Sequence, residues 1–438
     1  MFNSNSFLKS TPRTASLVMA TLLTTLFTGC VSSTSTNTPP PQTGDTAAAD
    51  GSANDVGSSD VSQGTDITSE TKQDIEQDVP ATKKDILVMM QAGFGMDPWS
   101  KSDANLRIVN LTTHTTLRNF ELGKRKIDEM AIDYAKGVAY LAESSDGKIT
   151  VLSLADGSFV KNFTFKGVRG LSLSKNGKKL YAIGYEDSSS LQGSLKLFNT
   201  ETGTLDGTLQ GAVNDQVYGL KISDDEKTAA YVAFDGSKPF LRTIDLTSFQ
   251  ELARTPILNS GSCSTMVSKI AFTDNGRIIL SDGNCDAIYQ YDIASKKLLS
   301  SLQIDFPNRD SGSAMNPVLA YSSSAKIGIA TKEDINPSAP DMQYGLYWFN
   351  PATLISSLVS EVTFSSAGAS TSAAGYPTSS TLLSDTKLLV NWRTLSNMGN
   401  APQEVRTLNL STLTWESTAA YLVEDNTRSV VSMSVGQE

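Results

Sequence analysis

The sequence predicts an all-β protein whose body, residues 85–438, is a seven-bladed β-propeller of four-stranded antiparallel blades. Three observations predict this fold. An alternating apolar pattern that ends in Asn, Asp or Ser recurs seven times, a further hairpin precedes most of the copies, and the C-terminal residues supply the strand that the first copy lacks. Two segments of different composition precede the body, residues 1–29 and 30–84.

Residues 1–29 are organised as a signal peptide. Lys9 and Arg13 supply positive charge, and the uncharged apolar stretch 15–27 follows them. This stretch has the length of a signal-peptide core and is shorter than the ~20 apolar residues that span a bilayer. Because no later segment is apolar enough to cross a membrane, the sequence predicts export without a transmembrane helix.

The sequence Leu-Phe-Thr-Gly-Cys at residues 26–30 resembles the lipobox of bacterial lipoproteins, in which small residues precede a cysteine. The resemblance implies that Cys30 carries a diacylglycerol and a further acyl chain such as palmitate, and becomes the mature N-terminus. Phe27 departs from the Leu that the family usually has. Val31 replaces the Asp that retains lipoproteins in the inner membrane, which favours the outer membrane, with a periplasmic or surface-exposed body. The alternative is a secreted protein in which Cys30 is incidental.

Residues 30–84 begin with the lipidated cysteine and continue as a linker rich in Ser, Thr, Pro, Gly, Ala and Asp, without aromatic residues. Nine acidic residues face three lysines, which gives a local charge of −6. Such a segment buries too little apolar area to offset the entropy of ordering, so it is predicted to be disordered. Its function would be to hold the body away from the lipid surface.

The recurring pattern of the body is a strand of alternating apolar residues followed by a turn residue. Its seven copies occupy residues 106–110, 149–153, 195–199, 241–245, 288–292, 346–350 and 405–409. Period-two alternation is typical of strands, and a final Asn, Asp or Ser suits a turn because its side chain bonds to nearby backbone amides. A second hairpin, turning at Asn-Gly in 176–177 and 275–276, precedes most copies, so each repeat holds four strands, A to D.

The two ends of the body predict how the ring closes. The first repeat begins with strand B at residues 86–91 and lacks a strand A before it. The last repeat is followed by the β-prone run 429–435, which has no further strand to pair with. We expect this run to complete the first blade, because closure removes two exposed sheet edges.

The segment Leu-Asn-Leu-Ser-Thr-Leu at residues 408–413 illustrates the motif that surrounds each turn residue. In this motif the body resembles the YVTN-type propellers of secreted bacterial proteins. These repeats occur in surface proteins, in lactonase-like enzymes and in many proteins of unknown role. The resemblance therefore implies the fold and leaves the activity open.

Cys263 and Cys285 are the thiols that remain once Cys30 is lipidated. Cys263 falls in the connection from blade 4 to blade 5 and Cys285 in the B–C loop of blade 5, and such connections emerge on the same face. An export compartment permits a disulfide between them, which would add ~3 kcal/mol in the chain-entropy model. The alternative is a pair of buried free thiols.

The sequence offers little catalytic chemistry. His114 is the one histidine of the chain, and its alignment with Gly157 and Gly203 places it in a C–D turn. A Ser-His-Asp triad or a two-histidine metal site would need His114, and no suitable partner lies near it in sequence. We interpret His114 as an exposed turn residue and predict no cofactor.

Acidic residues gather in the predicted B–C loops on one face. Calcium binds several oxygen ligands, so these residues are candidate calcium ligands, although turn formation and solubility are the simpler explanation. They are Glu143, Asp146, Glu186, Asp187, Asp235, Asp282, Asp286, Glu333 and Asp334.

Three B–C loops are longer than the others: 92–105 in blade 1, 332–344 in blade 6 and 392–404 in blade 7. Closure of the ring would make these blades adjacent. Large aromatic residues and Arg are typical of interface anchors, so the loops predict a ligand-binding patch, with packing against their own blades as the alternative. The candidate ligand-binding residues are Phe94, Trp99, Tyr344, Trp392 and Arg393.

The net charge of −10 disfavours nucleic acid and anionic lipid as direct partners of the body. The tether, the scarcity of histidine and the aromatic loops favour a non-catalytic module of the bacterial cell envelope that binds a protein, peptide or glycan. Two alternatives remain open: a lactonase-like or other metal-assisted hydrolase acting in the propeller channel, and a structural envelope component.

Overall fold

The computed structural model describes fifteen segments of the chain: 84–93, 101–186, 191–211, 215–235, 238–257, 267–274, 276–282, 287–303, 319–334, 341–353, 355–365, 375–394, 403–416, 421–423 and 428–438. The chain separates into the units Met1–Gln77 and Asp78–Glu438, and all described residues belong to the second unit. The predicted signal peptide, the lipidated cysteine and the linker up to residue 83 lie outside the described residues. In the described segments, none of the elements is a helix that could cross a bilayer.

The described residues form seven antiparallel sheets, the blades of the fold. Blade 1 contains β29 (Arg428–Gln437), β1 (Asp85–Gly93), β2 (Ser102–Asn110) and β3 (Thr115–Arg125). Blade 2 contains β4 (Glu129–Asp133), β5 (Val138–Glu143), β6 (Lys148–Ser153) and β7 (Phe159–Thr164). Blade 3 contains β8 (Gly170–Leu173), β9 (Lys179–Tyr185), β10 (Gly193–Asn199) and β11 (Leu205–Gln210).

The other four blades follow in chain order. Blade 4 contains β12 (Asp215–Ile222), β13 (Thr228–Asp235), β14 (Lys238–Asp245) and β15 (Gln250–Pro256), and blade 5 contains β16 (Val267–Thr273), β17 (Arg277–Asp282), β18 (Ala287–Asp292) and β19 (Lys297–Gln303). Blade 6 contains β20 (Leu319–Ser322), β21 (Ile327–Asp334), β22 (Asp341–Asn350) and β23 (Ile355–Ser365). Blade 7 contains β24 (Gly375–Ser384), β25 (Lys387–Thr394), β26 (Gln403–Asn409) and β27 (Thr414–Trp415), and the short strand β28 (Tyr421–Val423) also pairs with β26.

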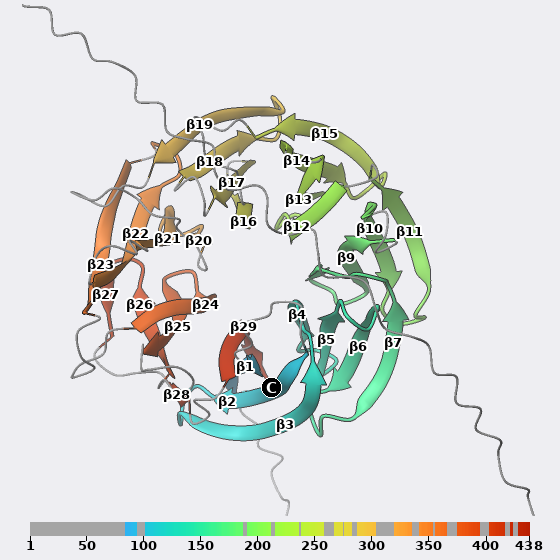
Figure 1. The fold of residues 1–438 in the computed structure, drawn as a ribbon, viewed down its shortest axis with the longest axis horizontal. Helices are drawn as coiled ribbons and strands as arrows, with labels where there is room; N and C mark the ends of the chain where they lie inside the picture. The colour runs from blue at the N-terminus through green and yellow to red at the C-terminus, as the bar shows by residue number, and fades with distance from the viewer. Residues whose placement is uncertain are drawn as a thin grey trace, which may run out of the picture. The chain divides into compact units, whose positions relative to one another are not determined.

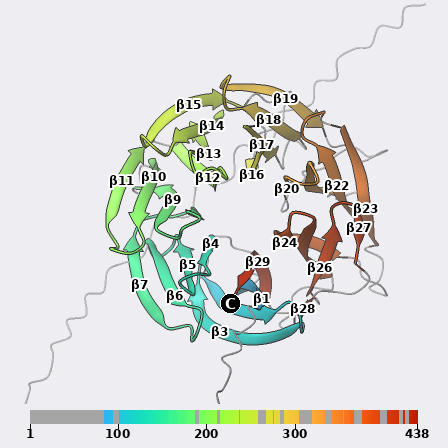
Figure 2. The ribbon, with the colours of Figure 1, turned by 180° about the vertical axis from the view of Figure 1, so that it is seen from behind.

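The blades are arranged radially as a ring. Figure 1 shows β4, β12, β16, β20, β24 and β29 innermost, while β3, β7, β11, β15, β19, β23 and β27 form the outer edge. β8 is at the opposite edge of its sheet from β11. Figure 2 shows the same order from behind. The predicted seven-bladed propeller is confirmed.

The ring closes as the sequence predicts. β29 pairs antiparallel with β1 from Asp85↔Gln437 to Gly93↔Arg428. Beyond the strand ends, the backbones of Lys84 and Glu438 exchange two hydrogen bonds of 3.0 Å. The last strand of the chain therefore completes the first blade.

Burial follows the position of a strand within its blade. After Lys179, every residue of β9 is buried, because a middle strand packs on both neighbouring blades. The outer strand β3 instead alternates exposed and half-buried residues along most of its length. Buried residues are therefore nearly continuous in a middle strand such as β9, whereas burial alternates along the outer strand β3.

Successive strands of a blade run in opposite directions, so the connections divide between two sides of the ring. We call the side with the A–B and C–D turns the turn face, and the side with the B–C and D–A connections the loop face. On the turn face, Asn110 Oδ1 accepts from the backbone amides of Thr112 and Thr113 over 2.8 and 2.9 Å, and Asn409 does the same with Ser411 and Thr412 over 2.9 and 3.1 Å. The turn role predicted for these residues is confirmed.

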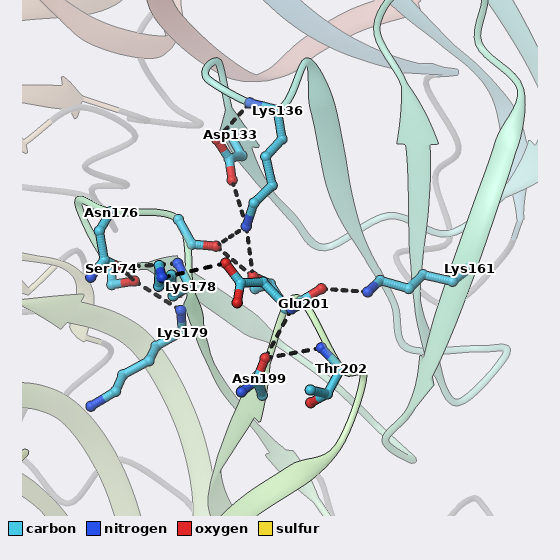
Figure 3. A network of polar contacts seen from close by, with 12 residues as sticks. Asp133, Lys136, Lys161, Ser174, Asn176, Lys178, Lys179, Asn199, Glu201 and Thr202 are labelled. Carbon is cyan, nitrogen blue, oxygen red and sulfur yellow. Dashed lines mark hydrogen bonds and ion pairs between the residues drawn. The ribbon is translucent and has the colours of Figure 1, made fainter.

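A polar network on the turn face joins blades 2 and 3 (Figure 3). Lys136 Nζ donates to Gly177 O over 2.7 Å and to Thr200 Oγ1 over 2.9 Å, and lies 3.4 Å from Asp133 Oδ2. Lys161 donates from the other side to Thr200 O. Because Lys136 and Asp133 belong to one blade and their partners to the next, the network fixes the angle between the two sheets.

We expect Gly177→Ala to lower the free energy of unfolding by about 2–3 kcal/mol. Gly177 has a φ of +67°, and a Cβ at this position would overlap the Asp133 carboxylate. Gly203→Ala is the matched control, because Gly203 has a φ of +80° with nothing within 4 Å of an added Cβ. Urea unfolding measures the free energy of unfolding of both variants. Equal losses of stability would show that the close approach of the added Cβ to Asp133 does not destabilise the protein.

Candidate functional site

The loop face of blades 1 and 2 carries five interacting charged side chains, the rim network: Lys101, Arg125, Glu143, Asp146 and Lys148. Arg125 Nη1 lies 2.6 Å from Glu143 Oε1, and the Glu143 side chain is 1% exposed. Lys101 Nζ lies 2.5 Å from Asp146 Oδ1, and Lys148 Nζ lies 3.8 Å from both carboxylates. The hydrogen bond from Lys101 lowers the pKa of Asp146, while partial burial acts in the opposite direction.

Other acids that the sequence suggests as calcium ligands also pair with cations. Glu186 Oε2 lies 3.1 Å from Lys196 Nζ, and Asp235 Oδ2 lies 3.4 Å from Arg254 Nη2. Asp282 is fully buried. Among the described residues, no group of three or more Asp, Glu, His or Cys side chains is placed to hold a metal ion. Calcium binding stays a prediction for the acids whose side chains the structure does not describe: Asp187, Asp286, Glu333 and Asp334.

At the inner edge of the ring, the loop face carries a second group of side chains, the inner cluster: Asp128, Arg169, Tyr185, Gln216 and Tyr218. Asp128 and Arg169 directly precede the innermost strands β4 and β8. Their backbone amides donate to carbonyls of β5 and β9 over 2.9 and 2.8 Å, which extends each inner strand by one residue. Arg169 Nη1 then donates to Asp128 Oδ1 over 3.2 Å, across the boundary between blades 2 and 3.

Arg169 and two tyrosines of the inner cluster are neighbours; Tyr185 is buried at 5% exposure, and Tyr218 is half-buried. The Arg169 guanidinium lies 5.7 Å from the centroid of the Tyr185 ring. Burial, reinforced by the neighbouring Tyr218, raises the pKa of Tyr185 to about 12, so this phenol is protonated at neutral pH. The Tyr218 hydroxyl donates to Gln216 Oε1 over 3.0 Å. The Tyr218 and Phe234 rings pack edge-on, with their centroids 5.7 Å apart.

The inner cluster offers the chemistry of a recognition site. Asp128 Oδ2 is buried and has no hydrogen-bond partner, so one acceptor of the ion pair is unsatisfied. Arg169 supplies a cation with a planar set of donors, and the half-buried Tyr218 supplies aromatic area with a polar end, while the buried Tyr185 packs beneath them. Arg and Tyr are enriched among the residues that dominate binding energy at interfaces.

Blade 7 meets blade 1 at a seam with two layers. Further from the loop face, the seam contains the apolar side chains of Leu87, Met89, Val109 and Leu389. Val405 and Val430 belong to the same cluster and pair in register with Asn391 and Gln91. Toward the loop face, the same pair of blades buries four carboxamides: Gln91, Asn105, Asn391 and Gln403. A closed interface between blades therefore ends in a polar layer just below the loop face.

Gln403 holds the last strand in this seam. Its Nε2 donates to Arg428 O, and its Oε1 accepts from Val430 N over 3.2 Å and from Asn391 Nδ2 over 3.3 Å. The Arg428 side chain also forms an ion pair with Glu121 of β3, with 2.7 Å between Nη2 and Oε2. These contacts anchor β29 to blade 7 and to the outer strand of blade 1.

The prediction that Trp392 is an exposed loop residue is wrong. β25 continues through Trp392 to Thr394, and Trp392 pairs with Glu404 of β26. Strand alternation turns its side chain toward blade 6, where it is 4% exposed and packs in one cluster with Leu346. The centroid of its ring lies 5.7 Å from that of the Trp415 ring, and the two ring planes meet at 74°. Trp392 is therefore a core residue.

The other candidate patch residues divide into two groups. Tyr344 and Arg393 lie in β22 and β25, because strand pairing continues further into the predicted loops than the sequence indicates; their side chains are not described. Phe94 and Trp99 lie outside the described residues. The closed ring confirms that blades 6, 7 and 1 are consecutive, and a ligand-binding role of these four residues stays a prediction.

Of the three remaining residues that the sequence singles out, the structure describes His114. His114 is exposed in the β2–β3 turn with a φ of +56°, like Gly157 and Gly203 in the equivalent turns, so its interpretation as a turn residue is confirmed. Cys263 and Cys285 lie outside the described residues, and their disulfide stays a prediction.

Sequence reasoning missed the inner cluster. Asp128 and Arg169 lie in D–A connections, where the sequence shows no motif, and only the ring brings the two connections together. A signal was available, because aligning the residues that precede each strand A places Asp128 and Arg169 at equivalent positions of consecutive repeats. The ligand-binding residues predicted from the sequence come from the B–C loops instead.

Solved structures include several proteins similar to this chain. One is a protein from Lactobacillus plantarum, with a TM-score of 0.54 and 12% identity over 81% of this chain and 99% of the other. The periplasmic gluconolactonase of Pseudomonas aeruginosa has a TM-score of 0.54 and 12% identity over 80% and 99% of the two chains. A 6-phosphogluconolactonase-like protein from Bacteroides fragilis has a TM-score of 0.51 and 12% identity over 80% and 98%.

At these identities the likeness shows the propeller fold alone. No protein family model matches the sequence, and no curated protein matches it.

Proposed function

We propose that the protein is a lipid-anchored binding module of the bacterial cell envelope, tethered through Cys30 and engaging a ligand at the loop face. The inner cluster carries this proposal: the Asp128–Arg169 ion pair, with a contact of 3.2 Å, lies beside two tyrosines where the innermost strands begin. The ligand we propose is an envelope glycan or peptide, because this set of side chains recognises hydroxyl, amide and carboxylate groups together.

The tether and the site fit one another in this proposal. An acylated Cys30 followed by the linker 31–84 would leave the body free to approach insoluble envelope material. We propose the outer membrane as its location, because the residue after Cys30 is Val31 and not the Asp that retains lipoproteins in the inner membrane. The net charge of −10 disfavours nucleic acid as the partner.

Removing both members of the Asp128–Arg169 pair is expected to weaken ligand binding at least about tenfold, which corresponds to ~1.4 kcal/mol. The double variant Asp128→Ala/Arg169→Ala leaves no uncompensated charge at the inner edge. The measurement is isothermal titration of the purified protein with soluble peptidoglycan fragments, which present N-acetylated sugars and acidic peptides.

The matched control is Asp225→Ala/Lys227→Ala. This ion pair, 3.6 Å apart, lies in the β12–β13 turn on the turn face, and both side chains are largely exposed. Its loss should leave binding unchanged. Equal affinity of both double variants and the native protein would refute the inner cluster as the binding site.

Hydrolysis of a sugar lactone is the second candidate function. Two of the similar solved structures are a gluconolactonase and a 6-phosphogluconolactonase-like protein. The Asp128 carboxylate, whose side chain is 13% exposed, is the candidate acceptor for the proton of an attacking water, and Arg169 beside it is suited to an anionic substrate. D-glucono-1,5-lactone hydrolysis above the spontaneous rate, abolished in Asp128→Asn, would favour this function over simple binding.

A further inference from the structure

The ion pairs of the rim network turn their cations outward. The Glu143 side chain is 1% exposed, whereas its partner Arg125 is 27% exposed. The Asp146 side chain is 24% exposed, and its partner Lys101 is 45% exposed. Lys148, which lies 3.8 Å from both carboxylates, is 33% exposed. The acids of the network therefore lie beneath its cations, and the surface that a ligand meets is positive.

Gly147, at the tip of the β5–β6 hairpin, joins the rim network to the inner cluster. Gly147 O accepts a hydrogen bond of 3.1 Å from the backbone of the connection 165–170, and a Cβ added at Gly147 would lie 3.5 Å from the Cα of Lys166. The same connection continues to Arg169 at the inner edge, where the guanidinium is again more exposed than the carboxylate of its partner Asp128. Outward cations thus extend from the rim network to the inner cluster.

These outward cations form a locally positive surface, the cationic strip: Lys101, Arg125, Lys148, Lys166 and Arg169. Residues 124–129, 143–148 and 165–170 contain six Lys and Arg residues and four Asp and Glu residues, a local charge of +2 in a chain whose net charge is −10. Salt screens charges beyond ~8–10 Å at physiological ionic strength. A ligand in contact with the strip therefore meets its local cations, and the net charge of the chain acts on it only weakly.

We propose that the cationic strip binds the carboxylates that recur along an acidic glycan, an inference that rests on the loop face being the binding surface. Each exposed ammonium or guanidinium group binds one carboxylate of the glycan through charge-assisted hydrogen bonds. Asp128 and Asp146 lie beneath these cations and stay partly exposed, so they accept hydrogen bonds from the sugar hydroxyls between the carboxylates.

The mixture of cations and acids favours such a glycan over other anions. Polyphosphate has no hydrogen-bond donors at neutral pH, so the carboxylates of the ion pairs would repel it. An acidic peptide has donors, but its flexible backbone loses conformational entropy at every residue that must be ordered before its carboxylates reach cations on three blades. A glycan built of rigid sugar rings carries both hydroxyl donors and carboxylates, and it orders fewer torsions.

The test uses polygalacturonate, which has one carboxylate per sugar, and its methyl ester, in which these carboxylates are neutral. We expect the native protein to bind polygalacturonate in isothermal titration, more weakly as salt is raised, and not to bind the ester. Lys148→Gln/Lys166→Gln should weaken the binding of polygalacturonate at least about tenfold, because two charge-assisted contacts are lost. Lys148→Arg/Lys166→Arg keeps both charges and should bind like the native protein.

The matched control is Lys178→Gln/Lys179→Gln, which removes two exposed lysines from the turn face and changes the net charge equally. It should bind polygalacturonate like the native protein, and both Gln double variants should keep the native melting temperature. Equal weakening by the two Gln double variants, or equal binding of polygalacturonate and its ester, overturns the proposal.

Two further probes decide between sources of negative charge. Tighter binding of poly-L-glutamate or of phosphatidylglycerol vesicles than of polygalacturonate would assign the strip to an acidic peptide or to a membrane and overturn the glycan. If Lys148→Gln/Lys166→Gln binds like the native protein while Asp128→Ala/Arg169→Ala still loses peptidoglycan binding, the cationic strip is refuted and the loop-face function stands without it.

Discussion

Removing residues 428–438 abolishes the cooperative folding of the propeller. These residues contain all of β29, the innermost strand of blade 1, and β1 loses its pairing from Asp85 to Gly93 without it. The deletion also removes the buried Val430 and Met433, each worth ~1.5–3 kcal/mol, and the Gln403 contacts that hold the seam. Since whole domains are stable by only ~5–15 kcal/mol, we expect no folded ring to remain.

Thermal unfolding followed by circular dichroism measures this effect. The truncated chain should show no sharp transition at the melting temperature of the native protein. As a control, a synthetic peptide of residues 428–438 added in trans should restore part of the transition, because the defect is a missing strand. An unchanged melting temperature after truncation would contradict the closure.

Trp392→Ala lowers the free energy of unfolding by about 3–5 kcal/mol, the range for truncation of a large buried side chain. Trp392 is 4% exposed and lies between blades 6 and 7 in one cluster with Ile329, Leu346 and Leu408. Its removal leaves a cavity between two sheets, and the edge contact with Trp415 is lost as well. Urea unfolding of the purified variant gives the value.

Trp415→Ala is the matched control, because Trp415 belongs to the same aromatic contact and is only half-buried at the outer edge of blade 7. Its loss should cost clearly less than that of Trp392. If Trp392→Ala cost under about 1 kcal/mol, the side chain would be a surface residue, as the sequence first indicated.

Much of the fold could be predicted because its determinants are local. Alternation, Asn-Gly turns and turn residues such as Asn110 and Asn409 act within a few residues, and the structure shows their side chains bonded to the expected backbone amides. Seven repeats reinforce a pattern that one copy would show only weakly. The missing strand A likewise followed from counting the strands of the first repeat.

The ends of strands were less predictable, which is why Trp392 was misplaced. The residues after Val390 are polar or aromatic and suit a loop as well as a strand. Pairing with β26 continues to Arg393↔Gln403, and this pairing depends on the partner strand in space. A side chain that sequence places at the surface is thereby enclosed between two blades.

The candidate site depended on contacts that no single repeat encodes. Asp128 and Arg169 are 41 residues apart and meet only because consecutive blades place their D–A connections side by side. Gln91 and Gln403 carry the same side chain in the same seam, yet only the structure shows that Gln403 is partnered and Gln91 is not. Hydrogen-bond satisfaction is a property of the assembled ring.

Hydrogen–deuterium exchange of the purified protein, with and without soluble peptidoglycan fragments, tests most directly whether the loop face binds the ligand. We expect slower exchange on ligand addition in residues 124–129 and 165–170, the connections that carry Asp128 and Arg169, and unchanged exchange in the turns 134–137 and 174–178 on the turn face. If exchange slowed only in those turns, or nowhere in the propeller, the loop face would not be the binding surface.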